Sequence, residues 1–235
     1  MLSLDWIWQQ IERNPRAEFL VGLESRYQYR DLSELILRFV AHFDALALSS
    51  GDRILIATQN EFLACSTFIA AMLDGIVPVM MSPDSPPARL VSIADSVSAS
   101  AIVADSELSW MTADGRKCIA PLNQETKKSW GQLFSNSGSG SRLADQLGLP
   151  RDARTPRLPQ EIDELCSLAF TSGTTSSPIG VMISRRNVLA NLTTISRLFD
   201  CGPESRLFND MILAHADGLV QGPLLAACPE SCCVA

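Results

Sequence analysis

Short apolar runs alternate with longer amphipathic segments in the first half of the chain. The runs at 52–58, 76–82 and 100–106 are compact, which is typical of strands that are buried on both faces. Between them, 61–75 and 85–97 carry apolar residues at helical spacing. Strand, helix, strand, helix, strand is the pattern of a parallel sheet covered by helices. We therefore predict an α/β fold.

The segments on either side follow the same two periodicities. Further elements are expected as a helix at 4–13 that ends at Asn14-Pro15, two short strands within 17–32, a helix at 32–46, a strand at 166–170 and a helix at 187–199. No internal repeat of fixed period is present, so the chain is not a solenoid or a propeller.

The composition changes between 135 and 160. "SNSGSGS" is flexible in composition and "LPRDARTPRLPQ" holds three prolines, so we predict a loop or linker there. This divides the chain into an N-terminal α/β subdomain at 1–134, the loop or linker at 135–160, and the start of a second α/β unit at 161–235 that we expect to be truncated.

The overall composition excludes several classes of protein. With 46% hydrophobic and 19% charged residues, the chain can bury a core. Its formal net charge of −7 argues against nucleic acid or an anionic membrane surface as partner, because both need a basic face. We recognise no secretory leader and no long apolar run, and therefore expect a cytoplasmic protein without a membrane span. The seven cysteines form no CxxC pair, which favours reduced thiols and no metal site.

A hydroxyl-rich turn comes directly after the apolar run at 166–170. Its sequence, "TSGTTSSPIG" at 171–180, offers backbone N–H groups and hydroxyls that can converge on an anion. In open parallel sheets, ligands bind beyond the carboxyl ends of strands. The Walker A pattern, the GxGxxG fingerprint and the GxSxG elbow are all absent, so the alternative of a plain polar loop stays open on these residues alone.

The wider sequence around this turn resembles the adenylate-forming enzymes, which include acyl-CoA synthetases, fatty acyl-AMP ligases and peptide-synthetase adenylation domains. "FTSGTTSSPIGVMISRRNVLANL" is similar to the family's hydroxyl-rich signature loop and to the helix after it, where Val181, Asn187 and Leu189 match the family pattern. "YQYRDL" and the long stretch at 51–90 resemble segments upstream of that loop in the family. The resemblance covers nearly the whole chain and implies the fold of the family's N-terminal domain.

The resemblance also implies a reaction. The loop would close over the β- and γ-phosphates of ATP, with Mg²⁺ helping to neutralise them, while a substrate carboxylate attacks the α-phosphorus. A thiol of coenzyme A, or the phosphopantetheine of an acyl or peptidyl carrier protein, would then take the acyl group from the adenylate. The residues that would bind the nucleotide are Thr171, Ser172, Gly173, Thr174, Thr175, Ser176, Ser177, Pro178 and Gly180. Further on, "LAHADGLVQGPLL" resembles the family segment whose histidine lies near the acyl pocket, which places His215 there.

Two residues of the loop depart from the family pattern. Ser176 stands where a glycine is usual, and Ser lacks glycine's freedom at positive φ. Ile179 stands where a lysine is usual, which removes a cation near the phosphates. The family's C-terminal domain with its catalytic lysine finds no match, since the only lysines are Lys117, Lys127 and Lys128. We therefore expect an incomplete or inactive fragment, with unknown catalytic residues.

Three functional hypotheses remain open from the sequence. The first is the N-terminal part of an ATP-dependent ligase for a small carboxylic acid. The second is a nucleotide-binding remnant or regulatory protein without ligase turnover, which Ile179 favours. The third is an α/β phosphate-binding module of another kind, such as a kinase-like protein. Pyrophosphate exchange that depends on a carboxylic acid would separate the first from the other two.

Overall fold

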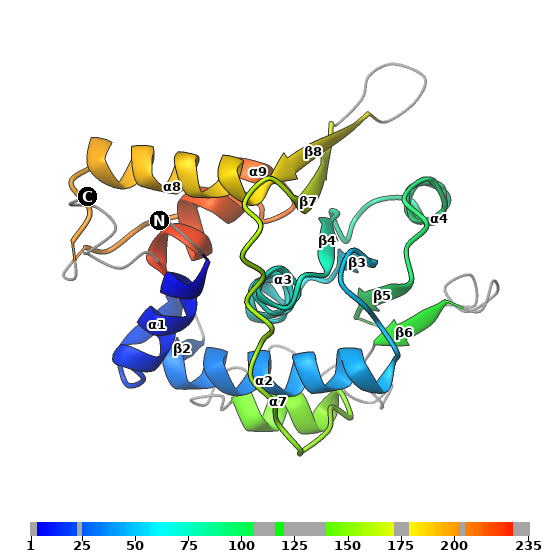
Figure 1. The fold of residues 1–235 in the computed structure, drawn as a ribbon, viewed down its shortest axis with the longest axis horizontal. Coiled ribbons are helices and arrows are strands. Elements are labelled where there is room, and N and C mark those ends of the chain that lie inside the picture. Colours follow the sequence, from blue (N-terminus) through cyan, green and yellow to red (C-terminus); the bar gives the residue numbers. More distant parts are fainter. Residues whose placement is uncertain are drawn as a thin grey trace.

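A computed structural model describes residues 4–22, 25–105, 116–119, 140–171, 179–202 and 205–227. Its centre is a sheet of six strands in the order β6-β5-β3-β4-β7-β8 (Figure 1). The strands are β3 (Arg53–Ala57), β4 (Val77–Met80), β5 (Ala101–Ala104), β6 (Lys117–Ile119), β7 (Leu165–Phe170) and β8 (Gly180–Ser184). All neighbours are parallel except β7 and β8, which form an antiparallel pair at one end of the sheet. The predicted α/β class is confirmed.

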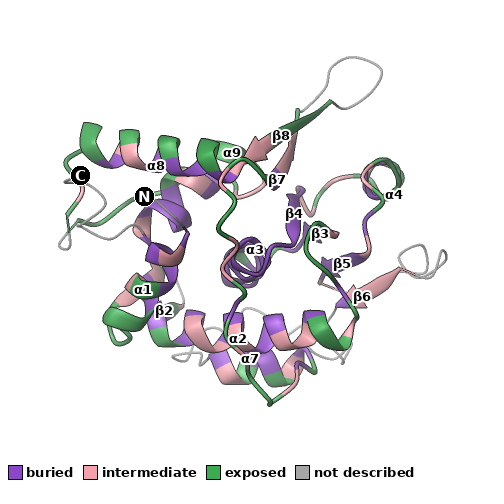
Figure 2. Ribbon diagram, in the orientation of Figure 1, coloured by how far each residue is buried: buried purple, intermediate pink, exposed green. Residues whose placement is uncertain are grey.

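Helices cover both faces of the sheet, as we expected from apolar runs that are typical of strands buried on both faces. The helices α1 (Asp5–Arg13), α2 (Tyr29–Ala45) and α3 (Glu61–Asp74) lie on one side, and α4 (Pro87–Ser96) lies on the other (Figure 1). Alternate residues of β3 point to the two sides. Ile54 and Ile56 belong to the large core cluster, whereas Leu55 packs in the smaller cluster under α4. Figure 2 shows α3 buried along almost its whole length, because it lies between the sheet and α2.

The boundaries of α3 follow from its flanking residues. The Asn60 side chain accepts a hydrogen bond from the Leu63 backbone N–H (2.8 Å), which caps the first turn. Gly75 ends the helix in the left-handed region at φ 81°. A Cβ at this position would lie 2.8 Å from Ser50 Oγ, which would have to move, and the positive φ would strain any larger residue. The predicted end of this helix at Gly75 is confirmed.

The N-terminal elements form a small layer beside the main sheet. The strands β1 (Glu18–Val21) and β2 (Arg26–Gln28) pair in antiparallel fashion, so the two short strands predicted within 17–32 are confirmed. The ring of Tyr27 in β2 stacks on Phe62 in α3, with 3.7 Å between the ring centroids. This stacking joins the small sheet to the core.

The segment at 140–160 is more structured than its composition predicts. It begins with a short helix, α7 (Gly140–Gln146), where we expected a loop or linker. Arg38 of α2 holds this helix in place, because it donates hydrogen bonds to the Asp145 carboxylate (2.7 Å) and to the backbone carbonyl oxygens of Leu149 (2.7 Å) and Pro150 (2.9 Å). The residues that Arg38 contacts lie more than 100 positions after it in the sequence, so local composition does not predict these hydrogen bonds.

Two of the described cysteines are buried in the core. Cys65 and Cys166 are free thiols in the core, and burial raises the pKa of both, so neither is poised to react as a thiolate. Within the described ranges, no helix is both long and apolar enough to cross a membrane.

Candidate functional site

The predicted phosphate loop connects β7 to β8. The Thr171 backbone N–H donates to the Ile179 carbonyl oxygen (3.1 Å), which closes the base of the loop. Thr171 lies just past the carboxyl end of β7, and β7 is parallel to β4, so the loop leaves the sheet at the edge where α/β folds bind ligands. The residues between these ends, Ser172, Gly173, Thr174, Thr175, Ser176, Ser177 and Pro178, lie outside the described residues. Their role in nucleotide binding stays a prediction.

Strand β8 was not expected from the sequence, which suggested a direct passage from the loop to a helix. Gly180 pairs with Phe170 across the hairpin, and a Cβ at Gly180 would lie 3.1 Å from Cζ of that ring. The glycine therefore leaves room for the aromatic ring to lie over the base of the loop. Val181 and Met182 are well exposed on β8, so the strand lacks the apolar face by which a strand is usually recognised.

A cation from a different element lies at the base of the loop. Arg89 of α4 donates from Nη2 to the Thr171 carbonyl oxygen (3.2 Å). This places a guanidinium beside the first residue of the predicted phosphate loop, on the side of the sheet that α4 covers. Sequence reasoning assigned no role to Arg89, although it lies in the stretch at 51–90 that resembles the family, because it is 82 residues before Thr171 and nothing local indicates that contact.

The family asparagine after the loop has a structural explanation. Helix α8 (Arg185–Leu198) begins with a capping box, in which Ser184 is the N-cap residue and Asn187 is the third helical residue. The Asn187 backbone N–H donates to Ser184 Oγ (3.2 Å), and the Ser184 backbone N–H donates to Asn187 Oδ1 (2.9 Å). The pair fixes the point where the chain turns from β8 into α8.

We expect Asn187→Ala to lower the free energy of unfolding by about 1 kcal/mol, the usual effect of losing a helix cap. Nucleotide affinity should stay unchanged, because the hydrogen bonds of this side chain to described residues go to Ser184. Urea unfolding and MgATP titration of the same variant measure both quantities. Asn191→Ala, at an exposed position of the same helix, is the matched control and should change neither. A large fall in MgATP affinity with intact stability would assign Asn187 a role in the site instead.

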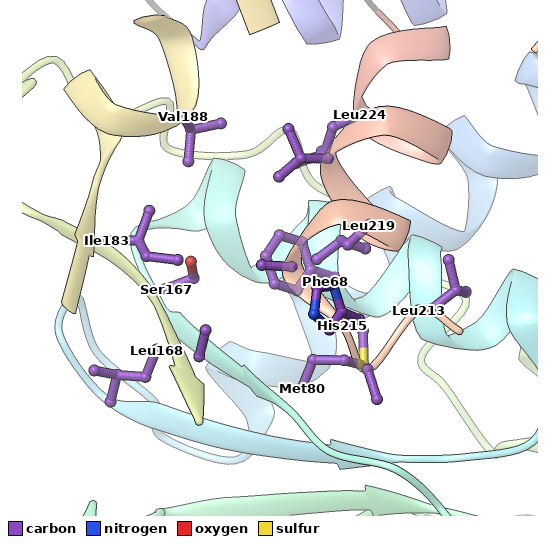
Figure 3. A pocket seen from close by; sticks show the side chains of 14 residues that line it. Phe68, Met80, Ser167, Leu168, Ile183, Val188, Leu213, His215, Leu219 and Leu224 are labelled. Atoms are coloured by element: carbon purple, nitrogen blue, oxygen red, sulfur yellow. The ribbon is translucent and has the colours of Figure 1, made fainter. Parts of the chain in front are cut away.

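A pocket opens next to the loop, on the face of the sheet that α3 covers (Figure 3). Its empty volume is about 410 Å³, with the open space at its mouth included. The lining residues come from α3, β4, β7, β8, α8 and the segment at 213–224, which contains α9 (Ala216–Leu219) and the π-helix η2 (Val220–Leu224). They are Phe68, Met80, Ser167, Leu168, Ala169, Ile183, Val188, Leu213, Ala214, His215, Ala216, Leu219, Val220 and Leu224.

A bulge in β7 shapes one wall of this pocket. The pairing register between β7 and β8 shifts between Leu165 and Ser167, which makes Cys166 the extra residue. Cys166 belongs to the large core cluster, and Ser167 and Ala169 line the pocket, while Phe170 packs toward the smaller cluster on the opposite face. No residue pattern in "CSLAF" indicates a bulge, so the pocket wall could not be predicted from the sequence.

His215 lies on the pocket wall and caps α9. Its Nδ1 accepts a hydrogen bond from the Asp217 backbone N–H (3.3 Å), which places the ring proton on Nε2. The Asp217 carboxylate is 3.7 Å from the same Nδ1, too far for a hydrogen bond. The His215 side chain is 56% exposed, and Figure 3 shows its ring on the side of the pocket formed by Leu213 and Leu219. His215 can therefore offer an N–H donor at the edge of an apolar pocket.

Comparison with known proteins identifies the family. The family model described as "AMP-binding enzyme" matches residues 7–234. Among curated relatives, the sulfoacetate–CoA ligase of Cupriavidus necator is 29% identical over 76% of the chain. The L-proline–[L-prolyl-carrier protein] ligase of Pseudomonas fluorescens is 27% identical over 85% of the chain.

Solved structures show the same fold. ATP-bound MatB from Rhodopseudomonas palustris matches 96% of the chain with a TM-score of 0.77 and 17% identity. The o-succinylbenzoate coenzyme A synthetase of Bacillus subtilis, in complex with AMP, matches 94% with a TM-score of 0.72 and 16% identity. The chain spans 33% and 38% of the two curated ligases, and 44% and 52% of these two solved chains. With the family model matching nearly its full length, the chain belongs to the AMP-binding enzyme family.

Proposed function

We propose that this chain is the nucleotide-binding, N-terminal part of an ATP-dependent ligase that converts a carboxylic acid to its acyl-adenylate. One observation carries the proposal: an apolar pocket with a histidine donor at its edge lies on the same strand, β7, that leads into the predicted phosphate loop. An acid in the pocket and ATP at the loop would thus be neighbours. Bringing two reactants together in this way is the main contribution a protein can make to such a reaction.

In the proposed reaction a carboxylate oxygen attacks the α-phosphorus of ATP. A new P–O bond forms to the acid, the bond between the α-phosphorus and the bridging oxygen breaks, and pyrophosphate leaves. Backbone N–H groups and hydroxyls of 171–178 would hold the β- and γ-phosphates, and His215 would orient the carboxylate through its Nε2–H. Arg89 would keep the first residue of the loop in place through its bond to the Thr171 carbonyl oxygen.

Mg²⁺ would enter with the nucleotide in this proposal. The described residues contain no group of three or more His, Cys, Asp or Glu side chains that could hold a metal ion. Mg²⁺ commonly keeps several water ligands and binds through substrate phosphates with few protein ligands, so it would arrive as MgATP. When bound, the ion would neutralise part of the phosphate charge.

The acceptor of the acyl group is the finer part of the proposal. The names of the two curated relatives mention different acceptors. One names coenzyme A, and the other names an L-prolyl-carrier protein. We propose a thiol acceptor of this chemistry, either coenzyme A or a carrier phosphopantetheine, and hence a carrier protein as a candidate partner of the complete protein. The small carboxylic acid is its other substrate.

Pyrophosphate exchange tests the proposed function. Label from pyrophosphate should enter ATP only when a carboxylic acid is present. A Thr174→Val/Thr175→Val variant, which removes two loop hydroxyls, should lose exchange, while Thr194→Val on the exposed side of α8 should not. Exchange without added acid, or ATP hydrolysis that ignores the acid, would contradict the proposal.

A second candidate is a nucleotide-binding protein without turnover. Ile179 favours it, because its exposed aliphatic side chain (66% exposed) stands at the end of the loop where the family usually has a lysine. MgATP binding measured by calorimetry, together with no exchange for any acid, would select this candidate over the ligase.

A further inference from the structure

Among the residues that the structure describes, the wall of the pocket beside β7 carries no Asp, Glu, Lys or Arg side chain. These lining residues are apolar except for Ser167 and His215. The apolar residues surround the space from several directions, with Phe68 of α3, Ile183 of β8, Val188 of α8 and Leu224 of η2 all facing it (Figure 3). A charged group placed among them would lose its water without gaining a partner of opposite charge.

The two polar side chains lie at different depths. His215 is more than half exposed, whereas Ser167 is only 5% exposed. The Ser167 hydroxyl oxygen projects into the pocket from β7 in Figure 3. Of the described lining residues, the one with an ionisable side chain, His215, therefore lies at the solvent side, and the buried part offers the uncharged hydroxyl of Ser167 among hydrocarbon.

This difference in exposure favours one orientation of an acid in the pocket. Ala169 lines the pocket and Thr171 begins the phosphate loop two residues further along the same strand, about 7 Å away. A carboxylate beside His215 would stay at the solvent side, and its hydrocarbon would extend toward the buried Ser167. In the opposite direction the carboxylate would be buried next to apolar side chains.

We propose that the pocket takes an uncharged, apolar acyl group, so that the acid is an aliphatic or aromatic monocarboxylate and not a dicarboxylate. The inference rests on the proposed function, because it assigns the pocket to the acid of that reaction. A second carboxylate at the far end of the acyl chain finds no countercharge among the described residues of the wall. A methylene finds apolar contacts throughout it.

A series of matched acids tests this on the unmodified 235-residue chain. Hexanoate and adipate share a six-carbon chain, but adipate adds a second carboxylate. In equilibrium dialysis with a non-hydrolysable MgATP analogue, hexanoate should bind at least tenfold more tightly than adipate. From butyrate to hexanoate, each added methylene should raise affinity about three- to fourfold. Equal or tighter binding of adipate, or no binding of any acid, would overturn the proposal.

A pocket-filling variant locates the binding. Ala169→Leu should lower hexanoate affinity at least tenfold and leave binding of the MgATP analogue unchanged. Ala190→Leu, the same change at an exposed position of α8, is the matched control and should change neither. Unchanged hexanoate affinity in folded Ala169→Leu would overturn the proposed location. If Ala169→Leu does not fold, as judged by circular dichroism, the acid series on the unmodified chain decides alone.

The two proposals fail in different ways. If the unmodified chain binds no MgATP analogue, the proposed function is contradicted, whatever the acids do. If the analogue binds and adipate is preferred over hexanoate, the proposed function stands and only the acyl class is wrong.

Discussion

Replacing Ile179 by lysine should tighten MgATP binding about tenfold or more. The Ile179 carbonyl oxygen bonds to the Thr171 backbone N–H at the base of the loop, and its side chain is 66% exposed. Because the Ile179 side chain is mostly exposed, replacing it by lysine would remove little packing, and the hydrogen bond from the Thr171 backbone N–H to the carbonyl oxygen of residue 179 would remain. Its ammonium group would reach the space beside the loop, where a charge-assisted contact to a phosphate is worth about 1.5–3 kcal/mol. Exposure to solvent reduces that value, so we expect an effect near its lower end.

The effect of Ile179→Lys must be separated from that of net charge. Met182→Lys adds the same charge three residues away, at a side chain that is 71% exposed on β8, outside the loop. Calorimetric titration with MgATP should show the gain for Ile179→Lys and no more than twofold for Met182→Lys. An equal gain in both variants would indicate general attraction of a polyanion. No gain in either would contradict the assignment of 171–180 as a phosphate loop.

The central sheet could be predicted because its information is local. In β3, β4 and β5 nearly every residue is buried, and such runs are unambiguous when helical segments separate them. Gly75 marks the end of α3 by its backbone angle, which few other residues adopt. The family resemblance also rests on local residue patterns, in the stretch at 51–90 and around the loop at 170–192.

The parts that could not be predicted depend on distant partners. Helix α7 is short and comes after a Gly/Ser stretch, and its position depends on Arg38, about a hundred residues earlier. Strand β8 has exposed apolar residues where alternation would be expected, because it lies at the end of the sheet. The pocket combines residues from 68 to 224, and its wall depends on a bulge at Cys166 that no residue pattern indicates.

The same dependence on distant partners governs the segment after α7, which crosses the ends of α2 and α3. Asp74, the last residue of α3, is fully buried. Arg154 donates to both of its carboxylate oxygens (2.7 Å each), and Arg157 donates to it from its backbone N–H (3.1 Å) and from Nη1 (3.1 Å). Both arginines also bond to Asp44 near the end of α2. Two arginines of a proline-rich segment thus hold the ends of two core helices together.

Arg154→Leu should lower the free energy of unfolding by about 2 kcal/mol. Breaking a buried ion pair by removing one partner costs about 3–5 kcal/mol, because a buried charge is left uncompensated. Arg157 still contacts Asp74, which reduces the loss. The control is Arg151→Leu, because Arg151 is 85% exposed and lies 3.5 Å from Asp145, so this variant should lose less than about 0.5 kcal/mol. Equal losses in the two variants, measured by urea unfolding, would show that Asp74 does not depend on Arg154.

The difference in unfolding free energy between the unmodified chain and Arg154→Leu should shrink as pH falls. The hydrogen bond from Arg154 holds the pKa of Asp44 below its ordinary value, so Asp44 stabilises the folded protein above the pKa that it has when unfolded, about 3.9. As pH falls below about 4 and through the lower folded value, Asp44 is protonated and that contribution is lost. The stability advantage of the unmodified chain over Arg154→Leu should therefore narrow between pH 5 and pH 3. Because the Asp44 side chain is 41% exposed, the narrowing should stay under about 1 kcal/mol. A gap that widens on acidification would contradict this assignment of Asp44.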